Sequence, residues 1–204
     1  MPDRAVAPFA RGTTYFKGKT VDSSDLPGPS VVGQVHVFQD TDPSDETKKR
    51  SNGDVVAIAV RNVSGVALLP KTLVQYKSDA IGKEVDGNSN SFSQVVAGVV
   101  DDHLPAAGCP DDDICWVIVK GPCTVKSAYI NMGKLVAIND PVHAHTAAAS
   151  TAGATESGRF TCNAAAAATA ASALLVSQNA IGRAITALTI GQTNYDTLID
   201  LSIK

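Results

Sequence analysis

Residues 115–119 read Cys-Trp-Val-Ile-Val, a short apolar run of the kind that forms a buried strand. Four further runs of similar length lie in the second half of the chain, with Gly, Asn or Asp turns between them: Val95–Val100, Lys134–Ile138, Ala184–Leu188 and Thr197–Ile203. In the last run, apolar residues alternate with Asp200 and Ser202, as in a half-buried strand. Several short strands at this spacing predict a mainly β fold, a compact antiparallel barrel or sandwich.

The first half of the chain predicts an N-terminal arm followed by further strands. Residues 1–30 contain Pro, Gly and polar residues, which favour an extended arm over a packed helix. The next elements are an alternating strand, a polar loop with a tight turn at its Asn-Gly pair, and two more strands: Val31–Phe38, Asp40–Asp54 with Asn52-Gly53, Val55–Arg61 and Leu73–Tyr76. We therefore divide the chain into residues 1–50, with the arm, first strand and polar loop, and residues 51–204, the β core.

One insertion in the core, near residues 146–177, departs from the β pattern. Thr146–Gly158 is a low-complexity stretch of Ala, Ser and Thr, which predicts a loop. Asn163–Ser177 is Ala-rich and predicts at most one short helix, with Asn163 as its N-cap. The apolar part, Ala164–Val176, is too short to cross a membrane, and the N-terminus lacks the apolar core of a signal peptide. We expect a soluble protein made in the cytoplasm.

The composition predicts a folded chain that does not bind nucleic acid. Hydrophobic residues make up 44%, charged residues 18% and aromatic residues 5%, so Val, Ile, Leu and Ala must build most of the core, with Trp116 as the one large anchor. The formal net charge is -3, and Lys and Arg are scattered apart from the run Lys48–Arg50. Phosphate binding requires a concentrated basic face, which this distribution does not provide.

The four cysteines, Cys109, Cys115, Cys123 and Cys162, are expected to be free thiols. Their spacing does not match the paired C-x-x-C of a zinc site. Cys115 and Cys123 would be able to pair only if their strands were neighbours, and disulfides are rare in a reducing cytoplasm.

Other residues capable of chemistry are better explained by structural roles. His143 and His145 form an H-x-H pair without an evident third ligand, so we predict no metal site. The carboxylates between Asp40 and Glu46 depart from the spacing of a calcium loop and suit a turn. The chain lacks G-x-S-x-G, a P-loop and G-x-G-x-x-G, and the least unlikely catalytic cluster is Asp101, His103 and Cys109. We therefore predict no catalytic residues, no cofactor and no enzyme.

The order of strands and turns in residues 55–204 resembles the capsid cement, or decoration, proteins of tailed bacteriophages. Two departures are Asn139-Asp140-Pro141, in place of the usual glycine-containing turn, and the length of the polar segment Thr146–Ser177. The resemblance rests on five segments: Val96-Ala97-Gly98-Val99-Val100, Cys115-Trp116-Val117-Ile118-Val119-Lys120-Gly121-Pro122, Gly133-Lys134-Leu135-Val136-Ala137, Asp140-Pro141-Val142 and Ile181-Gly182-Arg183-Ala184.

The resemblance implies a non-enzymatic virion protein that binds the outer surface of the phage capsid and bridges neighbouring major capsid subunits. It also implies a homo-oligomer, for which we favour a trimer over a dimer because cyclic symmetry matches the local axes of an icosahedral lattice. Phe9, Tyr15 and Phe16 are candidate capsid contacts, since aromatic residues often carry interface energy; the alternative role is packing on their own domain. The alternative function is a β-sandwich module of a phage tail or fibre that binds a host glycan.

Overall fold

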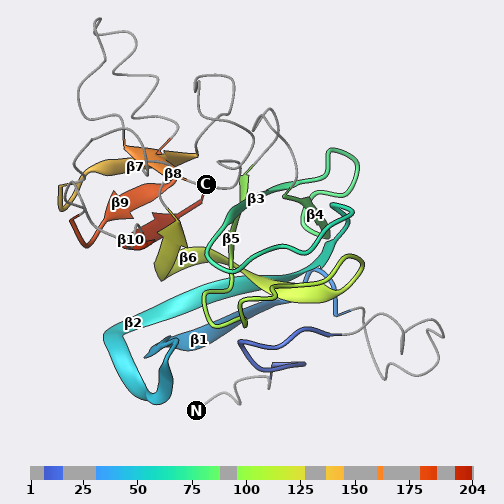
Figure 1. The fold of residues 1–204 in the computed structure, drawn as a ribbon, viewed down its shortest axis with the longest axis horizontal. Coiled ribbons are helices and arrows are strands. Elements are labelled where there is room, and N and C mark those ends of the chain that lie inside the picture. Colours follow the sequence, from blue (N-terminus) through green and yellow to red (C-terminus); the bar gives the residue numbers. More distant parts are fainter. Residues whose placement is uncertain are drawn as a thin grey trace, which may run out of the picture.

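The computed structural model describes residues 7–15, 31–87, 96–126, 137–144, 160–162, 180–187 and 196–203. In these residues it contains strands and turns and no helix, so the described chain is mainly β, as predicted (Figure 1). The strands are β1 (Val35–Asp42), β2 (Asp45–Asn62), β3 (Leu73–Tyr76), β4 (Glu84–Asp86), β5 (Val96–Val100), β6 (Ile114–Lys126), β7 (Pro141–Ala144), β8 (Phe160–Cys162), β9 (Gly182–Ala184) and β10 (Asp196–Ser202).

Five of these strands close into a ring. β2 pairs with β4, β4 with β3, β3 with β5 and β5 with β6, and β6 returns to β2. Apolar side chains from these strands and their connecting loops form one buried cluster: Val60, Leu68, Val74, Val85, Ala97, Val100, Leu104, Cys109, Cys115 and Val117. The ring is the barrel-like part of the predicted fold.

Two long strands, β2 and β6, extend the sheet beyond the ring. β1 pairs with β2 on one side, and on the other side β6 is followed by β10, β9, β7 and β8. A second cluster covers one face of this extension and includes Val55, Cys123, Ile199, Leu201 and Ala184. Because side chains alternate along a strand, their neighbours in sequence point to the opposite face. That opposite face carries the candidate site.

The N-terminal segment, residues 7–15, covers a third cluster around Trp116. The indole ring of Trp116 is fully buried and stacks on the ring of Phe9, with centroids 4.6 Å apart. Its Nε1 donates to the Phe9 carbonyl oxygen at 3.2 Å. The Tyr15 backbone pairs with Ile114 at the start of β6. This part of the predicted arm is therefore packed on the sheet.

The prediction of a polar loop at Asp40–Asp54 is wrong. β1 continues to Asp42, Pro43 and Ser44 form the turn, and β2 begins at Asp45. The pairing changes from Thr41 opposite Lys49 to Gln39 opposite Asp54, so Asn52-Gly53 lies in a bulge of β2 and not in a tight turn. Neither residue of that pair has a positive φ. β2 also runs through residues 50 and 51, where we divided the chain.

Gly121-Pro122 does not end the strand that begins with Ile114, as the sequence suggested. β6 continues to Lys126 because Gly121 adopts a φ of 100°, and a Cβ there would lie 2.3 Å from the Asp54 carbonyl oxygen. Two other predicted strands differ where they are described. Ala137 and Ile138, the described part of the predicted strand Lys134–Ile138, belong to a turn, and β9 ends at Ala184, where the predicted strand Ala184–Leu188 began. β3 and β5 form where predicted, and β10 covers Asp196–Ser202. The predicted loop Thr146–Gly158 and the predicted helix lie outside the described residues, and between them Phe160–Cys162 form β8.

Candidate interaction surface

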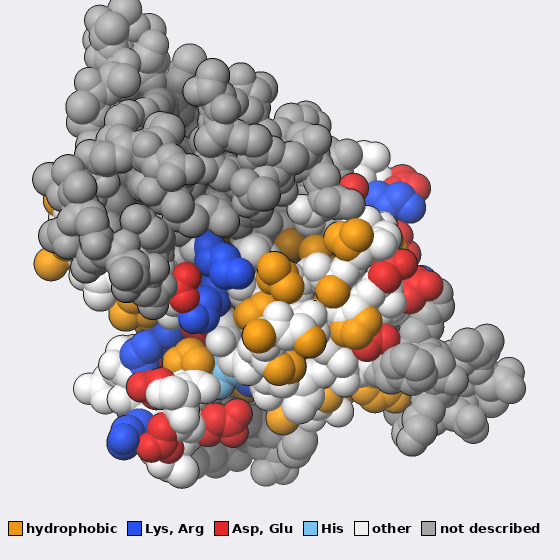
Figure 2. Space-filling model, in the orientation of Figure 1, with side chains coloured by type: hydrophobic (Ala, Val, Ile, Leu, Met, Phe, Trp, Pro, Cys, Tyr) orange, Lys and Arg blue, Asp and Glu red, His pale blue; other side chains and the backbone are white. Residues whose placement is uncertain are grey.

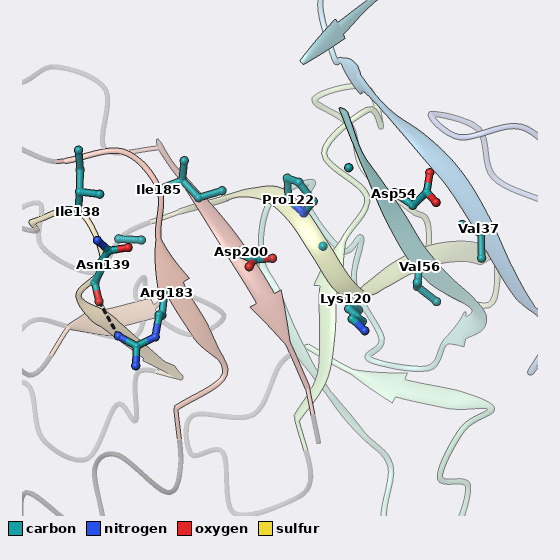
Figure 3. Close-up of a pocket in the computed structure, with 13 residues that line it drawn as sticks. Val37, Asp54, Val56, Lys120, Pro122, Ile138, Asn139, Arg183, Ile185 and Asp200 are labelled. Carbon is teal, nitrogen blue, oxygen red and sulfur yellow. Dashed lines mark hydrogen bonds between the residues drawn. The ribbon is translucent and has the colours of Figure 1, made fainter. Parts of the chain in front are cut away.

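The exposed face of the extended sheet is hollowed into a groove of about 770 Å³. One wall comes from β1 and β2, the floor from β6 and β10, and the other wall from β9 and the turn before β7 (Figure 3). The lining residues are Val37, Gly53, Asp54, Val56, Lys120, Gly121, Pro122, Ile138, Asn139, Arg183, Ala184, Ile185 and Asp200. We call this surface the groove.

Strand register explains why these side chains meet. Val37 lies opposite Val56, and Val56 lies opposite Lys120 across the β2–β6 pairing. Two residues further along β6, Pro122 lies opposite Asp200, which in turn lies opposite Arg183. Side chains two residues apart on a strand share a face, so both rows open into the groove.

The groove combines apolar side chains with a balanced set of charges. Val37, Ile138 and Ile185 are exposed by 47%, 61% and 37%, respectively. Asp54 and Asp200 offset Lys120 and Arg183, so the lining has no excess of either charge. A polyanion such as nucleic acid would require a basic excess. The lining is better suited to a protein surface that contains both charges and apolar patches.

The turn that forms one rim of the groove is held by specific contacts. Asn139 adopts a φ of 72°, a conformation that Gly and Asn tolerate best, which explains how it replaces a glycine-containing turn. The Asp140 carboxylate accepts a hydrogen bond from the Ala137 amide at 2.8 Å. Arg183 Nη1 donates to the Asn139 carbonyl at 3.0 Å, as Figure 3 shows. The rim is therefore tied to β9.

The molecular surface carries other exposed groups besides the groove. In the view of Figure 2, hydrophobic side chains gather around β3 and β4, whereas acidic and basic side chains mix near the β1–β2 hairpin. Val66, Leu69 and Ile81 are the exposed large aliphatic residues of the loops around β3 and β4. They contribute no polar groups arranged for a ligand.

A buried ionic network, none of whose side chains lines the groove, ties the N-terminal segment to the sheet. Arg11 bonds to the carboxylates of Asp101 and Asp102 at 2.8 and 2.7 Å, and Asp101 also accepts from the Gly12 amide. Arg50 bonds to Asp102 and Asp40. Burial raises the pKa of Asp102, but the charges of Arg50 and Arg11 and the hydrogen bonds from Arg50 and the Thr124 amide outweigh it, so the pKa is lowered. The network pairs all five residues away from solvent.

The structure places two of the three candidate capsid contacts. Phe9 and Tyr15 are half-buried and pack on the cluster around Trp116, their ring centroids 6.1 Å apart. This is the packing on their own domain that the sequence left open. Phe16 lies outside the described residues.

Asp101, His103 and Cys109, which the sequence analysis considered as a catalytic cluster, do not form a site. Asp101 is occupied by Arg11 and Gly12, and Cys109 is fully buried among apolar side chains. His103 lies with Nε2 3.2 Å from the Thr41 carbonyl and Nδ1 3.8 Å from Glu46. Each of the three side chains is engaged with different partners.

The remaining sequence candidates have structural roles where they are described. Asp40 pairs with Arg50, while Asp42 and Asp45 accept hydrogen bonds from Ser44 and Thr47 in and beside the hairpin turn. His143 lies on β7, but its side chain and His145 are outside the described part. Within the described ranges no group of three or more His, Cys, Asp or Glu is placed to hold a metal ion. In the same residues no helix has the length and apolar character to cross a membrane.

Cys109, Cys115 and Cys123 are free thiols, as predicted, and all three are buried. A hydrogen bond with Cys109, together with burial, raises the pKa of the Cys115 thiol well above its usual value. Burial does the same for Cys123. Thiols of this kind are poor nucleophiles.

Sequence reasoning missed both the groove and the ionic network. The groove depends on pairings between strands far apart in the chain, and Arg11 meets Asp101 only after the N-terminal segment has crossed the sheet. One signal was present in the sequence: Lys120-Gly121-Pro122 and Arg183-Ala184 both belong to the segments that carry the phage resemblance.

Comparisons with known proteins identify no family. No family model matches the chain, and no curated protein matches it. Among solved structures, a chain of "The capsid of Myoviridae Phage XM1" is similar with a TM-score of 0.42 and 18% identity, over 72% of this chain and 83% of that one. The head fiber gp8.5 N base in bacteriophage phi29 is similar with a TM-score of 0.37 and 13% identity, over 74% and 96%. Likenesses as distant as these assign no function.

Proposed function

We propose that this chain is a non-enzymatic structural protein of a bacteriophage virion that binds the outer surface of the capsid and bridges neighbouring major capsid subunits. One observation carries the proposal. The segments that resemble phage cement proteins, including Lys120-Gly121-Pro122 and Arg183-Ala184, converge on one exposed groove. Its mixture of apolar and charged side chains suits contact with another protein.

Such a subunit would stabilise the head by binding an assembled lattice more tightly than its free subunits. Preferential binding to one state stabilises that state by mass action. A subunit or oligomer that touches several capsid subunits also gains effective concentration at each further contact. We propose that it acts as a homo-oligomer. The exposed parts of Phe9 and Tyr15, which lie outside the groove, remain candidate capsid contacts, as does Phe16.

The first test is the location and copy number of the chain in purified virions. We expect it in dissected heads, at a stoichiometry comparable to that of the major capsid protein. Its presence only in tails, or its absence from virions, would contradict the proposal. Binding to a glycan array together with a tail location would instead favour the glycan-binding alternative.

The second test concerns the groove. The double substitution Lys120→Glu and Arg183→Glu reverses both basic side chains of the lining, and we expect affinity for isolated heads to fall by about tenfold or more, equivalent to roughly 1.4 kcal/mol. Lys83→Glu, at an exposed lysine outside the groove, is the matched control and should bind as the unmodified protein does. Equal binding by all three proteins would exclude the groove as the capsid contact.

A further inference from the structure

The outer edge of β1 offers backbone groups that no described residue uses. The Ala59 amide donates to the Gln34 carbonyl, so the even-numbered residues of β1 direct their N–H and C=O groups toward β2. Since these groups alternate sides along an antiparallel strand, those of Val35, Val37 and Gln39 point away from the sheet. Within the described part of the chain, β2 is the only strand that pairs with β1, and no hydrogen bond of the turns and loops involves these three residues.

This edge lacks the features that usually prevent one strand from pairing with another. Exposed edges are commonly protected by Lys, Pro, a bulge or an inward-pointing charge. Residues 35–39 read Val-His-Val-Phe-Gln, with no charged residue or proline, and their pairing with β2 is regular up to Gln39. The side chains of Val35 and Val37 are 56% and 47% exposed. An apolar edge of this kind is suited to accept a further strand.

We propose that the occupant of this edge is β1 of a second copy of the chain, paired antiparallel about a two-fold axis through Val37. In this register Val37 faces Val37 of the second copy, and Val35 faces Gln39 of the second copy. Each of these pairs exchanges two N–H···O hydrogen bonds, because the groups on both strands point outward. The sheets of the two copies then continue into each other.

Side-chain chemistry favours a second copy over a foreign strand. Val37 lies opposite Val56 within one chain, so the axis produces an uninterrupted row of valines, Val56 and Val37 from each copy. No residue of the paired segment is charged, so no like charges face each other, and Lys120 lies beyond Val56 at each end of the row. The irregular pairing between Gln39 and Thr41 ends the contact on both sides. Because the two-fold contact occupies the β1 edges of both copies, the assembly closes as a dimer and does not grow into a fibre through this edge.

Cysteine cross-linking tests the register directly. In a Cys162→Ser background, Val37→Cys should form an intermolecular disulfide under mild oxidation, because opposed residues of this type have Cα atoms about 5.5 Å apart. Val35→Cys is the matched control on the same face of β1, and it should not cross-link because it faces Gln39 of the second copy, four residues along the strand from the second Val35. Combining Val35→Cys with Gln39→Cys should restore the disulfide. Equal cross-linking by Val35→Cys and Val37→Cys would overturn the register.

Light scattering over a series of concentrations tests the assembly itself, without any capsid. The purified chain should approach twice its 21.0 kDa monomer mass, and Val37→Lys should weaken the dimer at least tenfold because two ammonium groups would face each other. Val35→Thr, a milder change on the same strand, should retain the dimer. A monomer at every concentration, or an oligomer that Val37→Lys leaves intact, would overturn the proposal. Loss of head binding by Val35→Lys, at an edge residue outside the groove lining, in a monomeric protein would assign the edge to a capsid strand instead.

Discussion

At the scale of single residues, Asp102 is the centre of the buried network, since its two carboxylate oxygens bind Arg11 and Arg50 and one also accepts from the Thr124 amide. Its folded-state pKa is lowered, so the carboxylate stabilises the fold above its unfolded pKa, near 4, and this contribution disappears as the pH falls through the lower folded value. Asp102→Asn should cost about 3–5 kcal/mol at pH 7, because two arginines lose a buried partner. It should also flatten the loss of stability below pH 4.

Urea unfolding between pH 7 and pH 2.5 measures both effects. Asp79→Asn is a suitable control, because Asp79 is 72% exposed and lies 3.9 Å from Lys77. The control should keep the stability and the acid dependence of the unmodified protein. If Asp102→Asn retained the same acid dependence, the network would not be the main acid-sensitive element.

At the scale of elements, β5 and β6 approach too closely for any side chain at Gly98. Its φ is 150°, and a Cβ would lie 2.2 Å from the Ile118 carbonyl oxygen. Gly98→Ala should destabilise the fold by about 4 kcal/mol or more, measured by chemical denaturation. Gly65→Ala is the matched control, because Gly65 also has a positive φ, 76°, but open space around it, so only the backbone cost of about 1–2 kcal/mol applies. Equal costs at the two positions would contradict this reading of β5.

The elements also show how far the sequence alone predicts this fold. β3, β5 and β10 follow from local runs of apolar residues, because each needs only its own pattern to be recognised. The sequence did not predict the polar first half of β2, because its side chains mostly face solvent and form no apolar pattern. Only its pairing with β1 in the hairpin makes it a strand. Gly121-Pro122 reads locally as a break, yet the close approach of Asp54 requires a glycine within a continuous strand. The groove was beyond prediction because it depends on register between strands distant in sequence.

At the scale of the whole molecule, the N-terminal segment holds the fold together and does not extend from it as a free arm. Residues 7–15 cover Trp116, the only tryptophan, and supply Arg11 to the buried network. Deleting residues before Ser30 should therefore lower the melting temperature as well as any capsid binding. A binding defect in such a deletion would not identify a contact, so single substitutions are needed.

Phe9→Ala separates the cover of Trp116 from the ionic network. The substitution removes the ring stacked on the indole while leaving Arg11 in place, and we expect a loss of about 1–2 kcal/mol because Phe9 is half-buried. Water should then reach Trp116, so its emission should shift to the red and acrylamide should quench it more strongly in the folded protein. Thr13→Ala, in the same segment but exposed, should change neither signal. An unchanged Trp116 spectrum in Phe9→Ala would mean that other groups, and not residues 7–15, shield the indole from water.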